Sequence, residues 1–529
     1  MTSSVRDLAE SAPAEPGPST TPRPATNVWL ARLCGVIAGL AGLAIADLVS
    51  RFTSLTGAPI PAVGGWLISL FPASVIDFGK TTLGTADKPV LLIGIGVVSL
   101  LVAGLAGQLE LRRRWGGLAV FLVLAVLSFV GVHAAADATL ASYLPTLVGM
   151  ALGYAILESL ITRAARAHRA DAPSAERRRF LRTVIIGGSV AAVGFVVART
   201  LQAGAAAVST ARSLVTLPAA GHQVAADVPA GAELGLPDLT PYVTANADFY
   251  RIDTALQVPS IDPATWSLTV TGLVENEITM SFADLLAEPM TEHLASLTCV
   301  SNEVGGDLAG NALWLGWPIR ELLARAKPRA GADMVLSTSH DGFTAGTPLE
   351  ALTDPERLAL LAVGMNGEPL PVAHGFPVRM VVPGLYGYVS ATKWVTQLKV
   401  TTFAADQGYW TPLGWSAKGP IKLASRIDVP SGTVDAGTVA VAGVAWRQHV
   451  GVKAVEVSVD NGAWESATLA ATAGPDTWRQ WSYPWAATPG THAIRVRAID
   501  AEGNVQTDAV AAPAPDGASG YHQVSVKVR

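Results

Sequence analysis

The sequence has almost no cysteine and little charge. Only two of its 529 residues are cysteines, Cys34 and Cys299, and 15% are charged, whereas 50% are hydrophobic. Two cysteines exclude a disulfide-rich scaffold and a Cys-rich zinc or iron–sulfur site, and their wide separation indicates that they act singly. The mean hydropathy of +0.37 does not fit an entirely soluble or a disordered chain, so part of the protein is expected to lie in lipid.

The chain also lacks an excess of positive charge. Its 37 lysines and arginines against 42 aspartates and glutamates give a formal net charge of −5. Without a basic field there is no general attraction to nucleic acid, so nucleic acid is not expected among its partners.

Long apolar runs are confined to the first 200 or so residues. Residues 1–28 are rich in Pro, Ser, Thr and Ala and are predicted to form a disordered cytoplasmic tail. Residues 29–202 are predicted to form an all-α transmembrane bundle, because five runs approach the ~20 residues that cross a bilayer as a helix. The runs are Trp29–Val49, Val90–Leu109, Gly117–Ala136, Leu144–Ile161 and Thr183–Leu201.

A sixth run, Pro61–Phe78, is weaker than the other five. It is shorter and is interrupted by Pro72 and Asp77. We interpret it as a re-entrant or interfacial segment, because a sixth span would invert the orientation of everything that follows.

The arginines indicate the orientation of the bundle. With five spans, the arginine-rich segments 1–28, 110–116 and 162–182 share one side, and the opposite loops carry only Arg51, Lys80 and Lys88. Positive loops stay in the cytoplasm, so the N-terminus is predicted to be cytoplasmic and everything after Leu201 extracytoplasmic. The lipid bilayer is thus an expected partner of a multi-pass protein.

The last basic segment resembles a twin-arginine export signal. It reads Arg177-Arg178-Arg179-Phe180-Leu181-Arg182 and precedes an apolar run. An ordinary basic cytoplasmic loop would explain the same arginines. If the segment is a signal, the twin-arginine translocase is a partner, the membrane is the cytoplasmic membrane of a bacterium, and a domain that folds around a cofactor lies downstream.

The composition and the hydrophobic periodicity of the chain change after the last apolar run. Residues 203–238 are rich in Ala, Val, Gly and Pro and are predicted to be a linker. Residues 239–425 mix short strands with amphipathic helices, which predicts an α+β domain. The predicted strands are Ser267–Val270, Met334–Ser337, Val378–Val382 and Trp394–Val400, and the predicted helices are Ser281–Leu286 and Pro318–Ala326.

Residues 426–529 read as strands separated by turns. The predicted strands are Val439–Val444, Ala454–Val459, Trp478–Trp485 and His492–Ala498. In the turn Val459–Gly462, Asn461 and Gly462 are expected to supply the positive φ angles of a type I′ hairpin. This pattern predicts an all-β sandwich of the immunoglobulin-like class.

Cys299 has three possible roles from its local sequence. It follows an apolar stretch and opens a loop that contains glycine. It could be a buried structural cysteine, a nucleophile that uses a nearby base such as His293, or a single thiolate ligand of a soft, redox-active metal. No His/Cys cluster accompanies it, so such a metal would need an organic dithiolene cofactor for its other ligands.

A series of motifs follows in a fixed order across about residues 240–529. They are Thr298-Cys299, Trp314-x-Gly316-x-Pro318, the run from Met365-Asn366-Gly367 to His374-Gly375-Phe376-Pro377-x-Arg379, and Lys393-Trp394. This series resembles the sulfite oxidase family of molybdopterin-dependent oxidoreductases. The resemblance implies molybdenum with molybdopterin, a pyranopterin dithiolene, as cofactor, and a C-terminal sandwich of the dimerisation type, hence a possible homodimer.

The resemblance implies a role for each matching residue. Cys299 would be the protein ligand of the metal, and the catalytic residues would be Cys299, Arg251 and Trp415. The cofactor would be held by Asn246, Tyr250, Arg251, Cys299, His374, Arg379, Gly387, Tyr388, Val389, Ser390 and Lys393. An arginine such as Arg379 suits the phosphate because its guanidinium gives two charge-assisted hydrogen bonds.

Two departures from the family pattern concern the substrate. Glu303 and Val304 stand where sulfite oxidases carry two arginines, the second of which helps to bind sulfite, and Trp415 stands where the family has its active-site tyrosine. A site with fewer cations binds a dianion less well. The branch of the family that reduces methionine sulfoxide in proteins also lacks these arginines, and its substrate is neutral.

The expected function is therefore two-electron oxygen-atom transfer by a membrane-anchored molybdopterin-dependent oxidoreductase, with a sulfoxide or another small oxide as substrate. Sulfite oxidation is the alternative within the family. A non-catalytic surface binding protein and a transporter are alternatives of other classes. The spans carry no evident haem ligands, so electrons are expected to pass to a separate electron-transfer protein or a quinone-linked partner.

Overall fold

The structure is a computed structural model of the chain. It describes residues 28–54, 57–71, 87–134, 138–167, 203–224, 226–255 and 258–529, with short stretches between 75 and 83 and between 175 and 192. The chain divides into two compact units, Met1–Arg199 and Thr200–Arg529.

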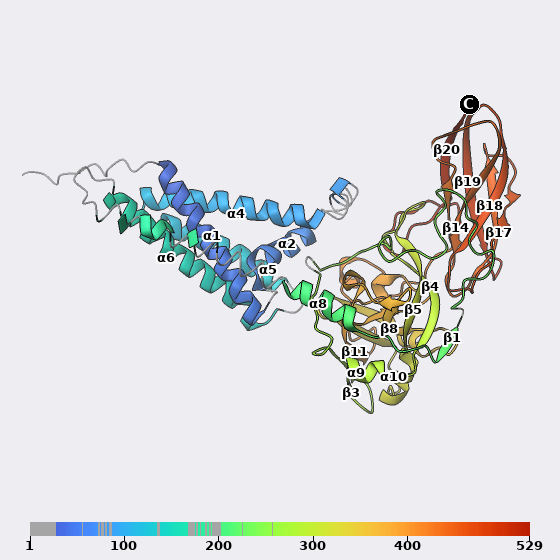
Figure 1. The fold of residues 1–529 in the computed structure, drawn as a ribbon, viewed down its shortest axis with the longest axis horizontal. Helices are drawn as coiled ribbons and strands as arrows, with labels where there is room; N and C mark the ends of the chain where they lie inside the picture. The colour runs from blue at the N-terminus through green and yellow to red at the C-terminus, as the bar shows by residue number, and fades with distance from the viewer. Residues whose placement is uncertain are drawn as a thin grey trace, which may run out of the picture. The chain divides into compact units, whose positions relative to one another are not determined.

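Among its described residues, the first unit contains four helices that are long and apolar enough to cross a membrane. They are α1 (Val28–Thr53), α4 (Asp87–Arg112), α5 (Gly116–His133) and α6 (Leu144–Ala167), the last preceded by the 3₁₀ turn η3 (Leu140–Tyr143). Helix α1 packs against α4 and α6, and α5 packs against α4, so the four helices lie side by side (Figure 1). Four of the five predicted spans are thus helices of spanning length.

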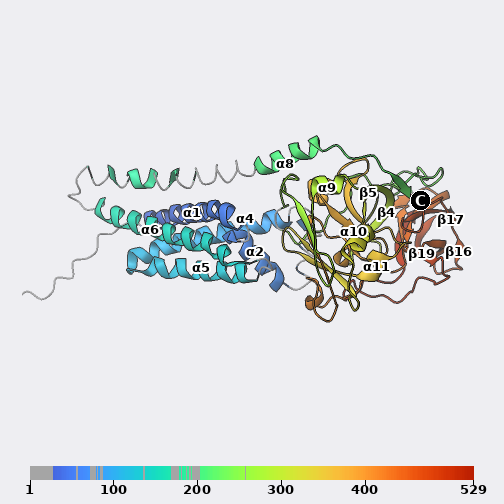
Figure 2. The same ribbon diagram turned by 90° about the horizontal axis from the view of Figure 1, so that it is seen from below.

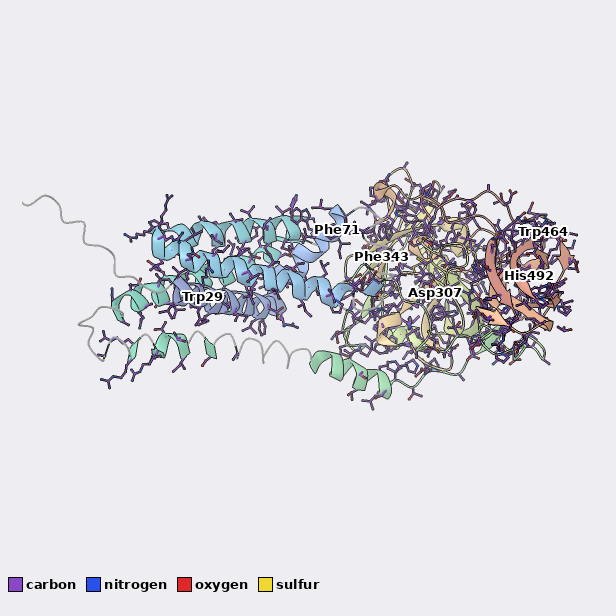
Figure 3. The ribbon with its side chains drawn as sticks, turned by 90° about the horizontal axis from the view of Figure 1, so that it is seen from above. Trp29, Phe71, Asp307, Phe343, Trp464 and His492 are labelled. Atoms are coloured by element: carbon purple, nitrogen blue, oxygen red, sulfur yellow. The ribbon has the colours of Figure 1, made fainter. Side chains whose placement is uncertain are left out.

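Two other predictions for this unit concern segments that are only partly described. The fifth span, Thr183–Leu201, lies largely outside the described residues, as do Arg177 and Phe180 of the motif Arg177–Arg182, so both stay predictions. Of the weak run Pro61–Phe78, the residues up to Leu70 belong to α2 (Pro59–Leu70), a helix of 12 residues, and most of those after Phe71 lie outside the described residues. At ~1.5 Å per residue this helix alone is too short for a ~30 Å hydrocarbon layer, and the re-entrant or interfacial interpretation of the run stays a prediction. Trp29 and Phe71 mark opposite ends of the unit in Figure 3.

Small residues allow α1 and α4 to approach closely. A Cβ atom on Gly35 would lie 2.1 Å from the carbonyl oxygen of Ala103, and one on Gly107 would lie 2.0 Å from that of Ala31. Both positions therefore exclude any larger side chain. Such close contacts are the usual source of helix association in lipid, where apolar surface gains nothing by leaving the solvent.

The second unit begins with two sheets that carry the α+β region. The first sheet has the order β1-β4-β5-β8-β10, with β9 paired to β8. Its strands are β1 (His222–Val224), β4 (Thr291–Thr298), β5 (Ala309–Pro318), β8 (Leu360–Met365), β9 (Glu368–Pro369) and β10 (Arg379–Val381). Strands β4, β5 and β8 form its buried centre, and β4 leads directly to Cys299.

The second sheet has the order β3-β2-β11-β6-β7. Its strands are β2 (Ser267–Gly272), β3 (Ile278–Ser281), β6 (Met334–Ser339), β7 (Thr344–Pro348) and β11 (Val395–Thr401). The short helices α9 (Phe282–Leu286), α10 (Ile319–Ala326) and α11 (Leu349–Thr353) belong to the same region (Figure 2). Helix α10 confirms the predicted apolar face, because Ile319, Leu322, Leu323 and Ala326 are completely buried.

The prediction of a plain linker at 203–238 misses two elements. Residues 203–214 form helix α8 (Ala203–Leu214), and β1 pairs in parallel with β4, with His222 opposite Thr291. Arg212 fixes α8 by donating to the carbonyl oxygen of Leu370 at 2.8 Å and by an ion pair with Glu368 at 2.9 Å. These partners are distant in sequence, so the local composition of the segment does not indicate them.

The C-terminal region is a sandwich of two sheets. One has the order β12-β14-β18-β17 and the other β13-β20-β19-β15-β16. The strands are β12 (Ala424–Val429), β13 (Thr433–Val434), β14 (Gly437–Trp446), β15 (Val452–Val459), β16 (Glu465–Ser466), β17 (Thr468–Leu469), β18 (Arg479–Ala487), β19 (Gly490–Asp500) and β20 (His522–Val528). Val441 and Trp481 of the first sheet share one core with Val455 and Val496 of the second. Trp464 and His492 lie in this region, apart from Phe343 of the α+β region (Figure 3).

The turn after β15 differs in detail from the prediction. Positive φ angles occur at Asp460 (52°) and Asn461 (60°), and the amide of Gly462 donates to the carbonyl oxygen of Val459 at 2.8 Å. The two left-handed positions are therefore one residue earlier than Asn461-Gly462. Asp460 adopts one of them because its carboxylate accepts from the amide of Ala493 at 2.9 Å and pairs with His492 at 2.7 Å.

Candidate active site

Cys299 is held at the end of β4 by its own backbone. Its amide donates to the carbonyl oxygen of Leu308 at 2.9 Å, which extends the β4–β5 ladder, and its carbonyl oxygen accepts from the amide of Asn302 at 3.1 Å. The side chain of Asn302 accepts from the amide of Leu308 at 2.9 Å and closes the loop. Cys299 is only 9% exposed, so its side chain is enclosed.

Tyr250, a residue predicted from the sequence, lies near this thiol. Burial, and next the proximity of Cys299, raise the pKa of Tyr250, whereas Arg379 acts in the opposite direction. A Cβ atom on Gly387 would lie 3.9 Å from both the Tyr250 hydroxyl and the carbonyl oxygen of Thr298. The loop that begins at Gly387 therefore covers the end of β4, beside Tyr250 and Cys299.

Arg379 carries a buried positive charge. Its side chain donates to the carbonyl oxygens of His374 (3.1 Å), Ala391 (3.4 Å) and Met380 (3.3 Å), and its guanidinium lies over the ring of Trp314 at 5.1 Å. Burial lowers its pKa to about 10. Within the described residues no carboxylate forms an ion pair with it, so neutral acceptors alone compensate its charge.

His374 is buried next to Arg379 and is neutral at pH 7. Burial, and then the charge of Arg379, lower its pKa to about 4. Its Nε2 lies 3.2 Å from the carbonyl oxygen of Asn246. A neutral ring can donate to that carbonyl only if Nε2 carries the proton, which makes Nδ1 an acceptor. The ring of Phe249 stands edge-on to it, with centroids 5.7 Å apart.

The side-chain amide of Asn246 is engaged by the protein itself. It donates to Glu368 at 2.6 Å and to the carbonyl oxygen of Met365 at 3.2 Å, and it accepts from the side-chain Nδ2 of Asn366 at 2.8 Å. Asn246 thus contributes to the site through its backbone carbonyl, which orients His374.

Asp253 is a site residue that the sequence did not reveal. Its side chain is 2% exposed and forms ion pairs with Arg251, at 2.9 Å, and with Lys393. The arginine and the lysine were both expected at the cofactor. No local motif marks Asp253, and only the fold brings residue 393 to it.

In the loop Gly387–Ser390, Val389 and Ser390 are buried, whereas Gly387 and Tyr388 are partly exposed. It forms the short 3₁₀ turn η5 (Gly387–Val389). Val389 is buried in the core of the α+β region, and the hydroxyl of Ser390 donates to the carbonyl oxygens of Tyr386 (2.9 Å) and Leu385 (3.1 Å). These two side chains stabilise the loop, which leaves Gly387 and Tyr388 to face its surroundings.

Trp415 joins the site through Tyr388. Their ring centroids are 6.0 Å apart, and the Tyr388 hydroxyl donates to the carbonyl oxygen of Ser416 at 2.7 Å. Trp410 stands edge-on to Trp415 at 6.2 Å and to Tyr409 at 5.1 Å. Sequence reasoning found Trp415 but not its two aromatic neighbours, although three aromatic residues within seven positions are a visible signal.

The residues fit the implied cofactor in two respects. The described residues contain no group of three or more His, Cys, Asp or Glu side chains that could hold a metal, so a metal at Cys299 must take its other ligands from a non-protein group. A buried guanidinium without a carboxylate partner also requires an anion to balance it, and the phosphate of molybdopterin is such an anion. The thiol of Cys299 and the cation of Arg379 supply these two functions near one loop.

Known proteins match the part of the chain that carries this candidate site. The family described as oxidoreductase molybdopterin binding domain matches residues 255–410. That range includes Cys299, His374, Arg379 and Lys393. Mouse mitochondrial sulfite oxidase is 30% identical over 321 residues, which cover 51% of this chain and 58% of that protein. The chain thus matches somewhat more than half the length of such relatives.

Two further relatives are informative. The uncharacterized oxidoreductase YuiH of Bacillus subtilis is 33% identical over 158 residues, which cover 30% of this chain and 76% of that protein. The sulfane dehydrogenase SoxCD of Paracoccus pantotrophus, a solved structure, is 24% identical, with 55% of this chain and 82% of that chain covered and a TM-score of 0.48. The chain contains an oxidoreductase molybdopterin binding domain and belongs to the sulfite oxidase family.

Proposed function

We propose that this chain catalyses two-electron oxygen-atom transfer, with Cys299 as the protein ligand of molybdenum. The observation that carries the proposal is the juxtaposition of the Cys299 loop, Tyr250 and the buried, carboxylate-free guanidinium of Arg379. When bound, the cofactor supplies two-electron redox chemistry in which an oxygen atom is taken up or given up.

The protein would hold and orient that group from several sides. Arg379 would bind the phosphate, and His374 would present its Nδ1 as an acceptor toward the pterin. Lys393 and Arg251, which both pair with Asp253, would contribute cations on another side of the group. The backbone at Gly387 and the ring of Tyr388 would cover the metal ligand.

A neutral oxide such as a sulfoxide is the substrate that the site favours. The carboxylate of Asp253 offsets the charge of Arg251, which weakens the attraction of a dianion. Glu303 is exposed in the loop after Cys299 and adds negative charge there. The rings of Tyr388, Trp410 and Trp415 offer an apolar surface beside the loop at Gly387. These features suit an uncharged substrate with an apolar substituent.

Sulfite oxidation is the second candidate. Its support is the similarity to mammalian sulfite oxidases and the presence of Arg251, whose side chain is 38% exposed and could meet an anion. A sulfite-oxidising site would require Arg251 to turn from Asp253 toward the substrate.

The surroundings of the site are part of the same proposal. The four long apolar helices support a membrane anchor, which we place in the cytoplasmic membrane of a bacterium, with a cytoplasmic tail at 1–28 and the catalytic region outside. We assign 239–425 to the molybdopterin domain and 426–529 to an immunoglobulin-like sandwich that could form a homodimer. A separate or quinone-linked protein would exchange electrons with the cofactor, and the twin-arginine translocase would export the folded domain.

The test combines metal analysis with a substrate panel. The full chain is purified in detergent from a host that makes molybdopterin, and is assayed with a reduced dye against sulfoxides, N-oxides, nitrate and chlorate, with sulfite oxidation in parallel. Cys299→Ser should abolish turnover, whereas the control Cys34→Ser should retain it. Unchanged turnover in Cys299→Ser would remove the mechanism, and a wild-type chain without molybdenum would favour the non-catalytic binding protein.

A further inference from the structure

The C-terminal sandwich forms polar contacts with β4, the strand that leads to Cys299. On β4, the Nε2 of His293 lies 2.8 Å from the carboxylate of Asp476, and both side chains are less than a tenth exposed. Further along, the amide of Ser296 donates to the carbonyl oxygen of Asp476 at 2.9 Å, and the hydroxyl of Ser296 accepts from the amide of Trp478 at 2.9 Å. The sandwich therefore contacts β4 at two successive places before the cysteine.

A third contact reaches the residue that directly precedes the cysteine. The Nε2 of Gln448 donates to the hydroxyl of Thr298 at 2.8 Å. Gln448 is 2% and Thr298 is 1% exposed, so water does not compete for this bond. Gln448 follows β14, in a turn that lies near Gly384 of the α+β region, because a Cβ atom on Gly384 would lie 3.2 Å from its carbonyl oxygen.

Thr298 connects this bond with the active site. It is β-branched, so it has few χ1 rotamers, and a hydrogen bond to its hydroxyl selects one of them. Its own carbonyl oxygen faces the Gly387 loop, and its next residue is Cys299. One residue thus bonds to the sandwich through its side chain and lies beside the candidate cofactor loop through its carbonyl oxygen.

We propose that Gln448 is a positioning residue that fixes the direction of the Cys299 thiol through Thr298. The sandwich then serves as the support of the metal ligand, in addition to any role in dimerisation. This inference rests on the proposed function only in taking Cys299 as the metal ligand. The restraint on the thiol itself is a property of the protein without cofactor.

The first test measures the thiol without cofactor. The chain has two cysteines, so in a Cys34→Ser background an alkylating reagent reports on Cys299 alone. Full-length protein is prepared in detergent from a host that does not make molybdopterin. Gln448→Leu should accelerate alkylation several-fold. The matched control is Gln506→Leu, because Gln506 is also buried, at 5% exposed, but bonds only within the sandwich, to Gly520, Ser425 and Ala498.

The second test uses the loaded enzyme. Loss of one buried hydrogen bond at the ligand strand should lower kcat about tenfold with little change in KM, and should alter the electron paramagnetic resonance signal of the molybdenum. Thr298→Val removes the acceptor with an isosteric side chain and should give the same two effects. The double variant should be no worse than either single variant, because both remove the same bond.

The outcomes separate this inference from the proposed function. If Gln448→Leu and Gln506→Leu behave alike in alkylation and in the spectrum, the positioning role is wrong. If Gln448→Leu does not fold, the Thr298→Val variant takes its place. An alkylation rate of Cys299 in Thr298→Val equal to that of the protein with Thr298 would then overturn the inference. If Cys299→Ser keeps molybdenum and its spectrum, the proposed function fails, whereas faster alkylation of Gln448→Leu would still show the restraint.

Discussion

Lys393 and Asp253 form an ion pair in which the two side chains are only 12% and 2% exposed, and Arg251 shares the same carboxylate. Removing one member of a buried pair leaves an uncompensated charge, which typically costs about 3–5 kcal/mol. Asp253→Asn should therefore lower the melting temperature of the unit Thr200–Arg529 and reduce its molybdenum content. The control is Asp435→Asn, because its pair with Arg529 is exposed. Equal melting temperatures would contradict a structural role for Asp253.

Replacing Arg379 should have the opposite effect on the cofactor-free chain. Its buried charge has no carboxylate partner among the described residues, so Arg379→Met removes a desolvated charge and should leave the melting temperature of that chain unchanged or higher. The same variant should lose molybdopterin, measured as the pterin released on denaturation. Arg426→Met is the contrasting control, because Arg426 pairs with buried Asp428 at 2.6 Å and its loss should destabilise the chain. A cofactor-free Arg379→Met chain that is clearly less stable would argue against an anion-binding role.

Stability at low pH should depend on Asp476. Burial alone would raise the pKa of its carboxyl, but hydrogen bonds from His293 and His449 lower that pKa to about 2. The folded-state pKa is thus below the unfolded value of about 3.9, so the stabilisation is complete above that value and is lost as the pH falls toward 2. About two pKa units correspond to roughly 2–3 kcal/mol.

The check is a series of thermal unfolding curves between pH 2 and pH 6. The wild type should lose melting temperature more steeply between pH 4 and pH 2 than Asp476→Asn, which has no carboxyl to protonate there. Parallel slopes for the two proteins would contradict the assignment.

Trp415 should affect substrate more than cofactor. Its ring contacts Tyr388 and Trp410 rather than the residues that surround Arg379. Trp415→Ala should lower kcat/KM for a sulfoxide about tenfold, since aromatic contacts contribute about 0.5–1.5 kcal/mol beyond their buried area, and should leave the molybdenum content unchanged. Trp464→Ala, in the sandwich, is the control. Loss of metal in Trp415→Ala would place the residue at the cofactor instead.

The helical unit can be tested with two glycines of the same helix. A Cβ atom on Gly107 would lie 2.0 Å from the carbonyl oxygen of Ala31, whereas one on Gly94 would have nothing within 4 Å. Gly107→Leu should separate α1 from α4 and lower the melting temperature in detergent. Overpacking of this kind typically destabilises a protein by about 1–3 kcal/mol. Gly94→Leu should not. Equal effects of the two substitutions would mean that the α1–α4 contact does not determine stability.

Sequence reasoning succeeded where the signal is local. The apolar face of α10 repeats every three to four residues and predicts the helix to within one residue at its start. His374 and Arg379 lie in one short motif, and the carbonyl of His374 accepts from Arg379 in the structure. The four long apolar helices follow from composition alone.

It failed where the partners are distant in sequence. Strand β1 exists because β4 pairs with it, and α8 is fixed by Arg212 through residues 156 to 158 positions away. No local motif distinguishes Asp253 in the sequence, because its partner Lys393 is brought to it only by the fold. Gln448 has no motif at all, and only the three-dimensional contact with Thr298 distinguishes it from other glutamines.

The bond between Gln448 and Thr298 joins residues that are 150 positions apart. A ribosome therefore finishes the strand with Cys299 long before it makes the groups that hold that strand. On the proposal made above, a nascent chain that has not yet emerged past Gln448 presents a cysteine without its final orientation. Insertion of the cofactor then has to wait until synthesis is nearly finished, and a truncation within the sandwich should yield protein that never acquires metal.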